Sequence, residues 1–363
     1  MMQVVVVGAD GFVGKNLTLF LDKIHNIVVH PVSRSTTQRQ LAAVMVDSSV
    51  VINLAGVNRP CNGDFSGNHT VLDQLIDTAS QCAASPRFFH LSSTKAVEAS
   101  DYGRSKALAE QKLQEAACFS DTMIYRAPNI YGKWCKPNYN SFISTCIHNV
   151  HNGVDIAFQD NPITLIYIDD LCAGIAAFVN EGATAAQNVF QQAEITTSVK
   201  SIVEKLQRFK KCSAIHLPDV RNINDKKLYA TYLSALPPTQ FVRSYHALSD
   251  SRGSFAELFK GLSGGQISIN KTIGDGIKGN HWHNTKCEKF IPITGTVVLS
   301  FRHMVTQDAF ELTVSSTAQQ VIDIPPGYAH SMRNASFGEE TCVLMWANEE
   351  FEHDRPDTIP EVV

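Results

Sequence analysis

A tyrosine and a lysine four residues apart are the first candidates for chemistry. Tyr102 and Lys106 share one face of a predicted helix, because residues at this spacing are neighbours on a helix surface. A nearby ammonium group favours the phenolate and lowers a tyrosine pKa from ~10, so the hydroxyl can exchange a proton near neutrality. Ser93 and Thr94 follow a predicted strand over 88–91. A hydroxyl group at this strand end can hold the oxygen of a substrate carbonyl.

Three histidines and one glutamate form a second candidate site. His281 and His283 alternate along a predicted strand, so both can face into a barrel, where Glu288 and His330 could complete the site. Three imidazoles and a carboxylate suit a divalent transition metal such as zinc, with iron, manganese and nickel also open. The sequence therefore predicts a metal site in the second half of the chain.

Glycines mark a third candidate site directly after the first apolar run. Gly8, Gly11 and Gly14 precede an amphipathic stretch. Glycines at a strand-to-helix turn let the backbone approach a pyrophosphate, whose charge then lies at the helix N-terminus. The second apolar run ends on Ser33 and Arg34 without a carboxylate, and an arginine there accommodates the extra phosphate of NADP. We therefore predict NADPH as the cofactor.

The segments that must position these residues show two different hydrophobic patterns. Before Leu236-Pro237-Pro238, apolar runs alternate with amphipathic stretches, which predicts a parallel sheet flanked by helices. After it, short strand-like runs separated by glycines predict an antiparallel barrel or sandwich. We expect an NADP-binding domain over 1–240 and a metal-binding domain over 241–363. The predicted strands are 4–7, 27–32, 50–54, 88–91, 123–125, 266–270, 290–293, 297–301 and 321–324.

Length and composition set outer limits on these expectations. At 363 residues the chain is too long for one ordinary hydrophobic core. A net charge of -4 makes nucleic acid a poor partner. Nine cysteines without a CxxC pair indicate reduced thiols and a cytoplasmic location. We find no signal peptide and no run of ~18 apolar residues, so we expect no membrane insertion.

Several motifs of the first half resemble the extended branch of the short-chain dehydrogenase/reductase superfamily. They are the GxxGxxG spacing, Asn53-Leu54-Ala55-Gly56, the Tyr102–Lys106 pair and the run from Tyr125 to Gly132. The resemblance implies a Rossmann-type doubly wound sheet, with Thr94, Tyr102 and Lys106 as catalytic residues and Ser93 as second choice for the hydroxyl. It implies cofactor contacts from Gly8, Asp10, Gly11, Phe12, Val13, Gly14, Ser33, Arg34, Leu54, Ala55, Gly56, Tyr102, Lys106 and Pro128. Asn129, Lys133, Trp134 and Lys136 suit a uridine diphosphate sugar.

The second half resembles the cupin superfamily. The match lies in HxHx4E and in PxGx2Hx3N, which ends at Asn334. Gln319 departs from the pattern, because cupins often have a glycine there. Asp250 to Glu257 look like the entry segment of cupin-type nucleotide-sugar epimerases, which implies that Arg252 and Glu257 contact the sugar nucleotide. Lys271, His303 and Tyr328 are candidates for an epimerase base by residue type alone.

A reductase fused to a cupin is similar, over nearly the whole chain, to a family of bifunctional capsular polysaccharide synthesis enzymes. That family epimerises a UDP-2-acetamido-2,6-dideoxy-4-ketohexose at C3 in the cupin and then reduces C4 with NADPH. The talose product is a precursor of UDP-N-acetyl-L-fucosamine. We also expect a homodimer. Two alternatives stay open: a reductase whose cupin only supports structure or assembly, and a non-catalytic NADP sensor.

Overall fold

The computed structural model describes most of the chain. Contacts divide it into a first unit of Met1–Tyr131, Asn138–Phe142 and Asn161–Ser198, and a second unit of Gly132–Pro137, Ile143–Asp160 and Val199–Val363. Each unit is considered by itself. The described residues are 1–60, 62–212, 214–245, 248–250, 253–255, 265–272, 276–335, 341–349 and 354–363.

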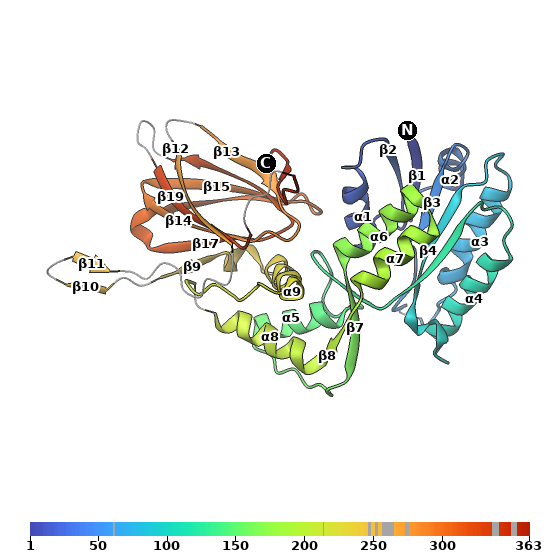
Figure 1. Cartoon of the computed structure of the whole chain (residues 1–363), viewed down its shortest axis with the longest axis horizontal. Helices are drawn as coiled ribbons and strands as arrows, with labels where there is room; N and C mark the ends of the chain where they lie inside the picture. Colours follow the sequence, from blue (N-terminus) through green and yellow to red (C-terminus); the bar gives the residue numbers. More distant parts are fainter. Residues whose placement is uncertain are drawn as a thin grey trace. The chain divides into compact units, whose positions relative to one another are not determined.

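The N-terminal apolar runs form a five-stranded parallel sheet in the first unit (Figure 1). Its strands, in spatial order, are β2 (Ile27–Val32), β1 (Met2–Val7), β3 (Val50–Asn53), β4 (Arg87–Ser93) and β5 (Thr122–Ala127). β1 lies between β2 and β3, so successive strands are added to the sheet first on one side of β1 and then on the other. Ligands bind at such switch points in open α/β sheets. The predicted Gly8–Gly14 and Asn53–Gly56 sites follow β1 and β3.

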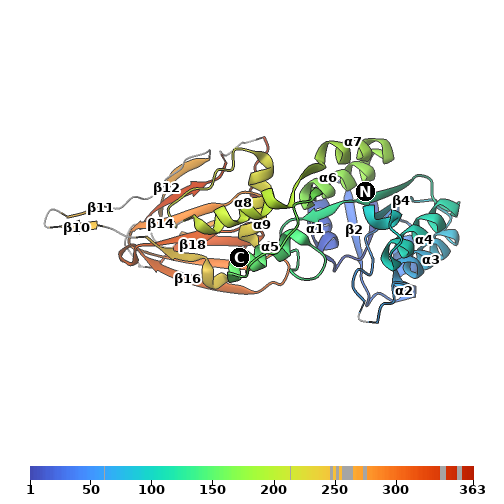
Figure 2. The same ribbon diagram turned by 90° about the horizontal axis from the view of Figure 1, so that it is seen from below.

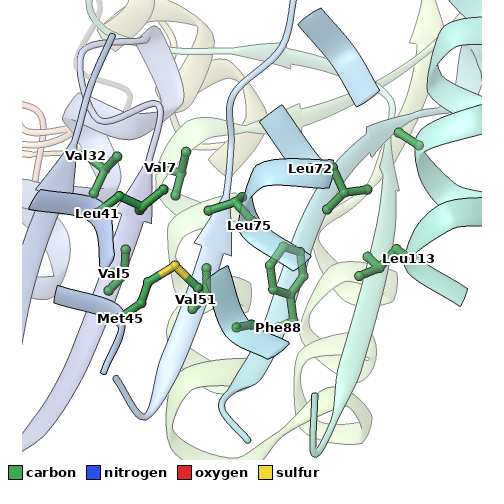
Figure 3. Packing of buried hydrophobic residues seen from close by; sticks show 12 residues of the cluster. Val5, Val7, Val32, Leu41, Met45, Val51, Leu72, Leu75, Phe88 and Leu113 are labelled. Atoms are coloured by element: carbon green, nitrogen blue, oxygen red, sulfur yellow. The ribbon is translucent and has the colours of Figure 1, made fainter. Parts of the chain in front are cut away.

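Helices cover both faces of this sheet. Alternate residues of β1 point to opposite sides, and Val5 and Val7 pack with Val51 and Phe88 against α2 (Gln38–Met45), α3 (Gly67–Ser80) and α4 (Asp101–Glu115), as Figure 3 shows. On the other face, Phe89 contacts rings of α6 (Ile168–Glu181) and α7 (Ala183–Ala193), and α1 (Phe12–Leu21) packs beside α6. A small sheet of β6 (Asn129–Tyr131), β7 (Pro162–Tyr167) and β8 (Ile195–Ser198) completes the unit.

Two antiparallel sheets form the second unit. A core that includes Phe241, Phe290, Leu299 and Tyr328 fills the space between them. One sheet has the order β12 (Gln266–Thr272), β19 (Thr341–Ala347), β14 (Glu288–Thr294), β17 (Gln320–Ile324), β9 (Val242–Ser244). The other is β16 (Ala309–Ser315), β15 (Thr296–His303), β18 (Tyr328–Asn334), β13 (Lys278–Trp282), β20 (Ile359–Pro360). A hairpin of β10 (Leu248–Asp250) and β11 (Gly253–Phe255) is separate. A parallel Rossmann-type sheet followed by an antiparallel barrel confirms the predicted fold class.

Three helices belong with the barrel strands, namely α5 (Phe142–Asn152), α8 (Val199–Lys211) and α9 (Ile223–Ser234) (Figure 2). Ala214 and Ile215, just after α8, pack on Ile291 and Val321 of the barrel. By contacts, the chain from Val199 onward therefore groups with the barrel, whereas the domain boundary at residue 240 stays a prediction. No helix in the described part of the chain is long and apolar enough to cross a membrane.

Candidate functional site

The glycine turn connects β1 to α1. Gly8 has a φ of +84°, a conformation that residues with a side chain rarely adopt. At Gly14, a Cβ atom would lie 2.6 Å from the Cα of Ala9, so only glycine lets the helix pass so close to the turn. Gly11 is the N-cap and no side chain caps this helix start, which suits a helix N-terminus that receives a phosphate group.

The turn after β3 approaches the predicted catalytic lysine. The Ala55 N–H donates to the Asn53 side chain at 3.1 Å. A Cβ atom on Gly56 would lie 3.1 Å from Lys106 Nζ and equally close to Asn68 Oδ1, so a larger residue would displace the ammonium group. The structure therefore brings a predicted cofactor segment and a predicted catalytic residue together.

Tyr102 lies in the first turn of α4, opposite the end of β4. Ser100 caps this helix by accepting a hydrogen bond from the Gly103 N–H at 3.1 Å. Burial raises the Tyr102 pKa, and the nearby Ser93 hydroxyl opposes the rise. Thr94 is exposed where a 3-10 helix begins. Ser93, the second choice from the sequence, thus lies near Tyr102, and the choice between Thr94 and Ser93 stays a prediction.

Lys106 is a buried cation, and a carboxylate lies one helical turn after it in the sequence. Its Nζ donates to the Leu91 carbonyl at 3.3 Å. Burial lowers the Lys106 pKa to about 8, and Glu110 opposes that change. Glu110 itself is buried, accepts a hydrogen bond from Ser92, and pairs with Arg126 at 2.6 Å. Sequence reasoning missed Glu110, although its position four residues after Lys106 was a usable signal.

The other predicted cofactor residues follow the same sheet edge. Arg34 is exposed just after β2, and the Ser33 N–H donates to Thr36 Oγ1 at 3.0 Å. Pro128 is buried before β6, where Asn129 is exposed and donates to the Thr164 carbonyl at 3.4 Å. Leu54, half-buried, follows β3, whereas Asp10, Phe12 and Val13 line the glycine turn.

Three residues predicted to bind substrate belong to the second unit. Lys133 is buried, and its ammonium lies 5.3 Å from the Trp134 ring and 5.9 Å from the Trp282 ring. The rings of Trp134 and Trp282 have centroids 6.0 Å apart, and Lys136 is exposed. Packing against aromatic rings therefore explains the positions of Lys133 and Trp134. Their contact with substrate stays a prediction.

The predicted metal ligands converge inside the barrel. His281 and His283 come from β13 and the residue after it, Glu288 begins β14, and His330 lies on β18. One donor atom from each of the four residues lies within 4.8 Å of all the others. Strand pairing brings this about, because His281 is directly opposite His330 in the sheet.

The protonation states of the residues in this cluster favour the binding of a cation. Burial and the neighbouring imidazoles lower the His281 pKa to about 4, and burial lowers the His330 pKa. Burial opposes ionisation of Glu288, but His283 and His330 outweigh it and hold the Glu288 pKa well below its usual range. Neutral imidazoles and an ionised carboxylate are the forms that bind metals.

Two donor atoms of the cluster have unused capacity. His283 Nε2 and Glu288 Oε2 lie 3.3 Å apart, but neither finds a hydrogen-bond partner of acceptable geometry among the described residues. Buried polar atoms normally have partners. The donor set and these two atoms fit a divalent cation of the kind that three imidazoles and a carboxylate prefer.

Comparisons with known proteins agree with both halves of this description. The model of the NAD dependent epimerase/dehydratase family matches residues 4–191, and that of the polysaccharide biosynthesis C-terminal domain matches 248–359. A Pseudomonas aeruginosa protein named UDP-2-acetamido-2,6-beta-L-arabino-hexul-4-ose reductase is 31% identical over 98% of each chain. The Staphylococcus aureus capsular polysaccharide assembling protein CapF is 34% identical over 100% of both chains, with a TM-score of 0.62. A structure of CapF with the inhibitor 3-isopropenyl-tropolone is 33% identical over the same span, with a TM-score of 0.59.

The chain belongs to the CapF family. The family resemblance predicted from the sequence is thereby confirmed, and with it an enzyme of the NAD(P)-dependent sugar reductase and epimerase class. The enzyme carries a His/Glu cluster able to hold a metal ion.

In this CapF family member, Lys286 is a further charged residue of the barrel site that sequence reasoning missed. Its Nζ lies 3.3 Å from Glu288 Oε1, and only 12% of the side chain is exposed. The three residues considered as bases differ in setting: Lys271 is exposed, Tyr328 is buried, and His303 Nδ1 accepts the N–H groups of Val305 and Thr306, both at 3.1 Å. Arg252 and Glu257, predicted to contact the sugar nucleotide, lie outside the described residues.

Cys135 and Cys287, which are close in sequence to predicted substrate and metal residues, are both free thiols. Cys287 is fully buried, and burial raises its pKa well above the usual range. A thiol that stays protonated is a poor nucleophile and metal ligand. Cys135 is half-buried in the second unit.

Proposed function

We propose that this enzyme converts a UDP-2-acetamido-2,6-dideoxy-4-ketohexose in two steps, C3 epimerisation in the barrel followed by NADPH-dependent reduction at C4. The observation that carries the proposal is that each unit holds its own cluster of reactive side chains: Tyr102, Ser93 and Lys106 in the first, and the four clustered donors in the second. The activity named for the Pseudomonas relative supports the reduction step.

For the reduction, the first unit's residues supply the proton and orient the reactants. Bound NADPH supplies the hydride that adds to C4. Tyr102 gives its proton to the oxygen on which negative charge develops, and Ser93 holds that oxygen, with Thr94 as the alternative. Lys106 stays charged near neutrality and stabilises the deprotonated tyrosine. Arg34, exposed after β2, favours NADPH because it can pair with the additional phosphate.

For the epimerisation, the C4 ketone makes the C3 proton acidic. Removal of that proton gives an enediolate, and return of a proton to the opposite face inverts C3. His281, His283, Glu288 and His330 would hold a divalent cation, for which zinc is the best match, and a cation there supplies Lewis acidity at the C4 oxygen. Lys271, His303 and Tyr328 stay open as bases. Lys286 joins them, because its ammonium lies 3.3 Å from Glu288.

The proposed product is UDP-2-acetamido-2,6-dideoxy-L-talose, a precursor of UDP-N-acetyl-L-fucosamine for a surface polysaccharide. We expect the enzyme to act as a homodimer. The alternative, a reductase with a purely structural barrel, predicts reduction without any change at C3.

A panel of 4-keto UDP-sugars tests the proposal. The metal-replete protein is incubated in deuterated water with and without NADPH, and product stereochemistry is determined by NMR. We expect deuterium at C3 without NADPH and the talose product with it. Reduction with C3 unexchanged and unchanged in configuration would establish the alternative, and no NADPH oxidation with any member would overturn the proposal.

A further inference from the structure

A segment near the C-terminus lies against the metal-binding strand. β20 pairs with β13, so that Pro360 is opposite His281 and Ile359 is opposite Trp282. The Glu361 N–H also donates to the Asn280 carbonyl at 2.8 Å. This pairing carries Asp357, two residues before β20, to the neighbourhood of His283.

The backbone carbonyl of Asp357 contacts the His283 ring. The Asp357 carbonyl oxygen lies 2.5 Å from His283 Nδ1. A carbonyl can only accept, so Nδ1 carries a proton, and in the neutral ring, the form that binds a metal, Nε2 then keeps its lone pair. That Nε2 lies 3.3 Å from Glu288 Oε2, inside the ligand cluster.

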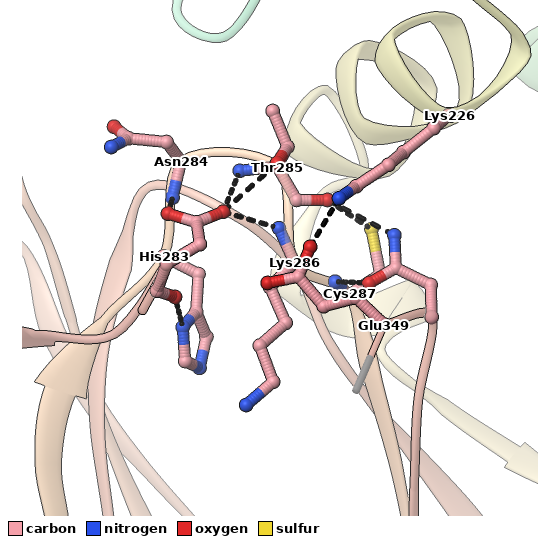
Figure 4. Close-up of polar contacts among 9 residues, drawn as sticks. Lys226, His283, Asn284, Thr285, Lys286, Cys287 and Glu349 are labelled. Carbon is pink, nitrogen blue, oxygen red and sulfur yellow. Dashed lines mark hydrogen bonds and ion pairs between the residues drawn. The ribbon is translucent and has the colours of Figure 1, made fainter. Parts of the chain in front are cut away.

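The carboxylate of Asp357 holds the turn that joins the two ligands His283 and Glu288. The turn residues Asn284, Thr285 and Lys286 are labelled in Figure 4. One oxygen accepts the Asn284 N–H at 2.8 Å. The other accepts the Thr285 N–H at 2.6 Å, the Thr285 hydroxyl at 2.9 Å and the Lys286 N–H at 2.8 Å. Four hydrogen bonds from three consecutive residues fix the turn to a single carboxylate.

A second side chain braces the same turn. Asn348 accepts the Cys287 N–H at 2.9 Å and donates to the Thr285 carbonyl at 3.1 Å. The next residue, Glu349, forms an ion pair with Lys226 of α9 (Figure 4). Asn348 hydrogen-bonds to the turn, whereas Asp357 contacts the His283 ring as well as the turn.

We propose that Asp357 is a positioning residue of the metal centre. Its carboxylate anchors the 284–286 turn, and its carbonyl keeps His283 in the Nδ1–H form with Nε2 directed at the cation. The inference rests on the proposed metal site and extends it to a residue 74 positions from the ligand that it orients. Loss of such a partner typically weakens metal binding about 10- to 100-fold.

Zinc affinity measured by competition with a chromophoric chelator tests this role in the full-length protein. We expect Asp357→Asn to weaken zinc binding about 10- to 100-fold and to change the visible spectrum of the cobalt-substituted protein. In the metal-free protein, ring nitrogen chemical shifts of His283 should change, because release of the 284–286 turn moves the ring relative to the Asp357 carbonyl. Asp354→Asn is the matched control, because Asp354 is exposed in the same segment, and it should leave all three measurements unchanged.

The outcomes separate this inference from the proposed function. Wild-type protein that binds no zinc overturns the metal site itself, and the inference with it. A wild type that binds zinc, together with an Asp357→Asn variant of equal affinity and spectrum, overturns the inference alone. Should Asp357→Asn fail to fold, Thr285→Val, which removes one of the four hydrogen bonds, should weaken zinc binding about threefold, and unchanged affinity would refute the role of Asp357.

Discussion

The reactive residues of the first unit are close in sequence, whereas those of the second unit are far apart. Tyr102 and Lys106 lie one turn apart on α4, and Ser93 ends the strand just before it. The barrel ligands lie on, or directly after, three different strands. The carbonyl that orients His283 belongs to Asp357. Local spacing is therefore enough to recognise the first site, but the second exists only once two sheets have closed.

The ionisable residues of the two sites also differ in their protonation states near neutral pH. In the first unit, burial lowers the Lys106 pKa only to about 8, with Glu110 opposing the change, so the lysine stays charged near neutrality. In the barrel, burial and neighbouring imidazoles lower the His281 pKa to about 4, which leaves a neutral ring. The first site is suited to exchanging protons with a substrate, and the second to holding a cation.

Replacing Tyr102 should separate the two sites most sharply. Tyr102→Phe removes the proton donor and should slow NADPH oxidation about 10²- to 10⁴-fold. Deuterium incorporation at C3, which depends on the barrel, should be unaffected. Both rates can be followed with the same 4-keto UDP-sugar, and NADPH oxidation at the wild-type rate would remove Tyr102 from the mechanism.

Replacing a barrel ligand should have the reverse effect. His281→Ala leaves three donors and should lower C3 exchange by about 10²-fold or more, while NADPH oxidation with an already epimerised substrate persists. NMR of the exchange reaction and zinc titration measure the two consequences. His148→Ala, an exposed histidine of the same unit, is the control, and equal exchange in both variants would contradict a catalytic cation.

A buried ion network of the barrel should be more sensitive to charge removal than an exposed ion pair of the same unit. Asp323 pairs with Lys289 at 2.5 Å and with Arg243 at 3.0 Å. Asp323→Ala leaves two cations without their partner and should cost about 3–5 kcal/mol in free energy of unfolding. Glu311→Ala breaks an exposed pair with Arg333 and should cost less than about 1 kcal/mol. Urea unfolding followed by tryptophan fluorescence compares them, and similar costs would refute the distinction.

Glu110 should set the alkaline limit of the reductase. The Lys106 pKa is about 8, and Glu110 raises it against the effect of burial, so the ammonium is lost as pH rises through this value. Glu110→Gln should lower the pKa further and move the alkaline fall of kcat/KM to lower pH, with a few-fold loss of rate at pH 8. A pH profile identical to that of the wild type would show that Lys106 does not limit the rate.

The smallest expected effect concerns the departure from the cupin pattern. Gln319 adopts a left-handed conformation with φ 53°, which explains why related barrels often have glycine there. A left-handed residue with a side chain costs about 1–2 kcal/mol, partly offset by the greater unfolded-state entropy of glycine. Gln319→Gly should therefore raise the free energy of unfolding by about 0.5–1 kcal/mol, measurable by urea unfolding. A decrease would mean that the Gln319 side chain contributes contacts of its own.

Much of the fold follows from local pattern. The predicted strands over 27–32 and 50–54 correspond to β2 and β3 within one residue, because β-branched runs bounded by turn residues have few alternatives. The sequence did not reveal β16, whose polar and apolar residues alternate on a half-exposed edge, or the grouping of α8 and α9 with the barrel. Helices covering a barrel look like helices covering a sheet, since both present one apolar face.

By itself, the sequence determined the residue types of both sites, because spacings such as four residues on a helix or two on a strand fix which side chains share a face. The tertiary structure alone shows that the chain turns into a 3-10 helix between the adjacent hydroxyls of Ser93 and Thr94, which leaves Thr94 exposed and Ser93 half-buried. It also decided that the Lys133 ammonium lies 5.9 Å from the Trp282 ring and that Asp357 reaches the 284–286 turn. These contacts join segments far apart in the chain, so only the closed barrel can specify them.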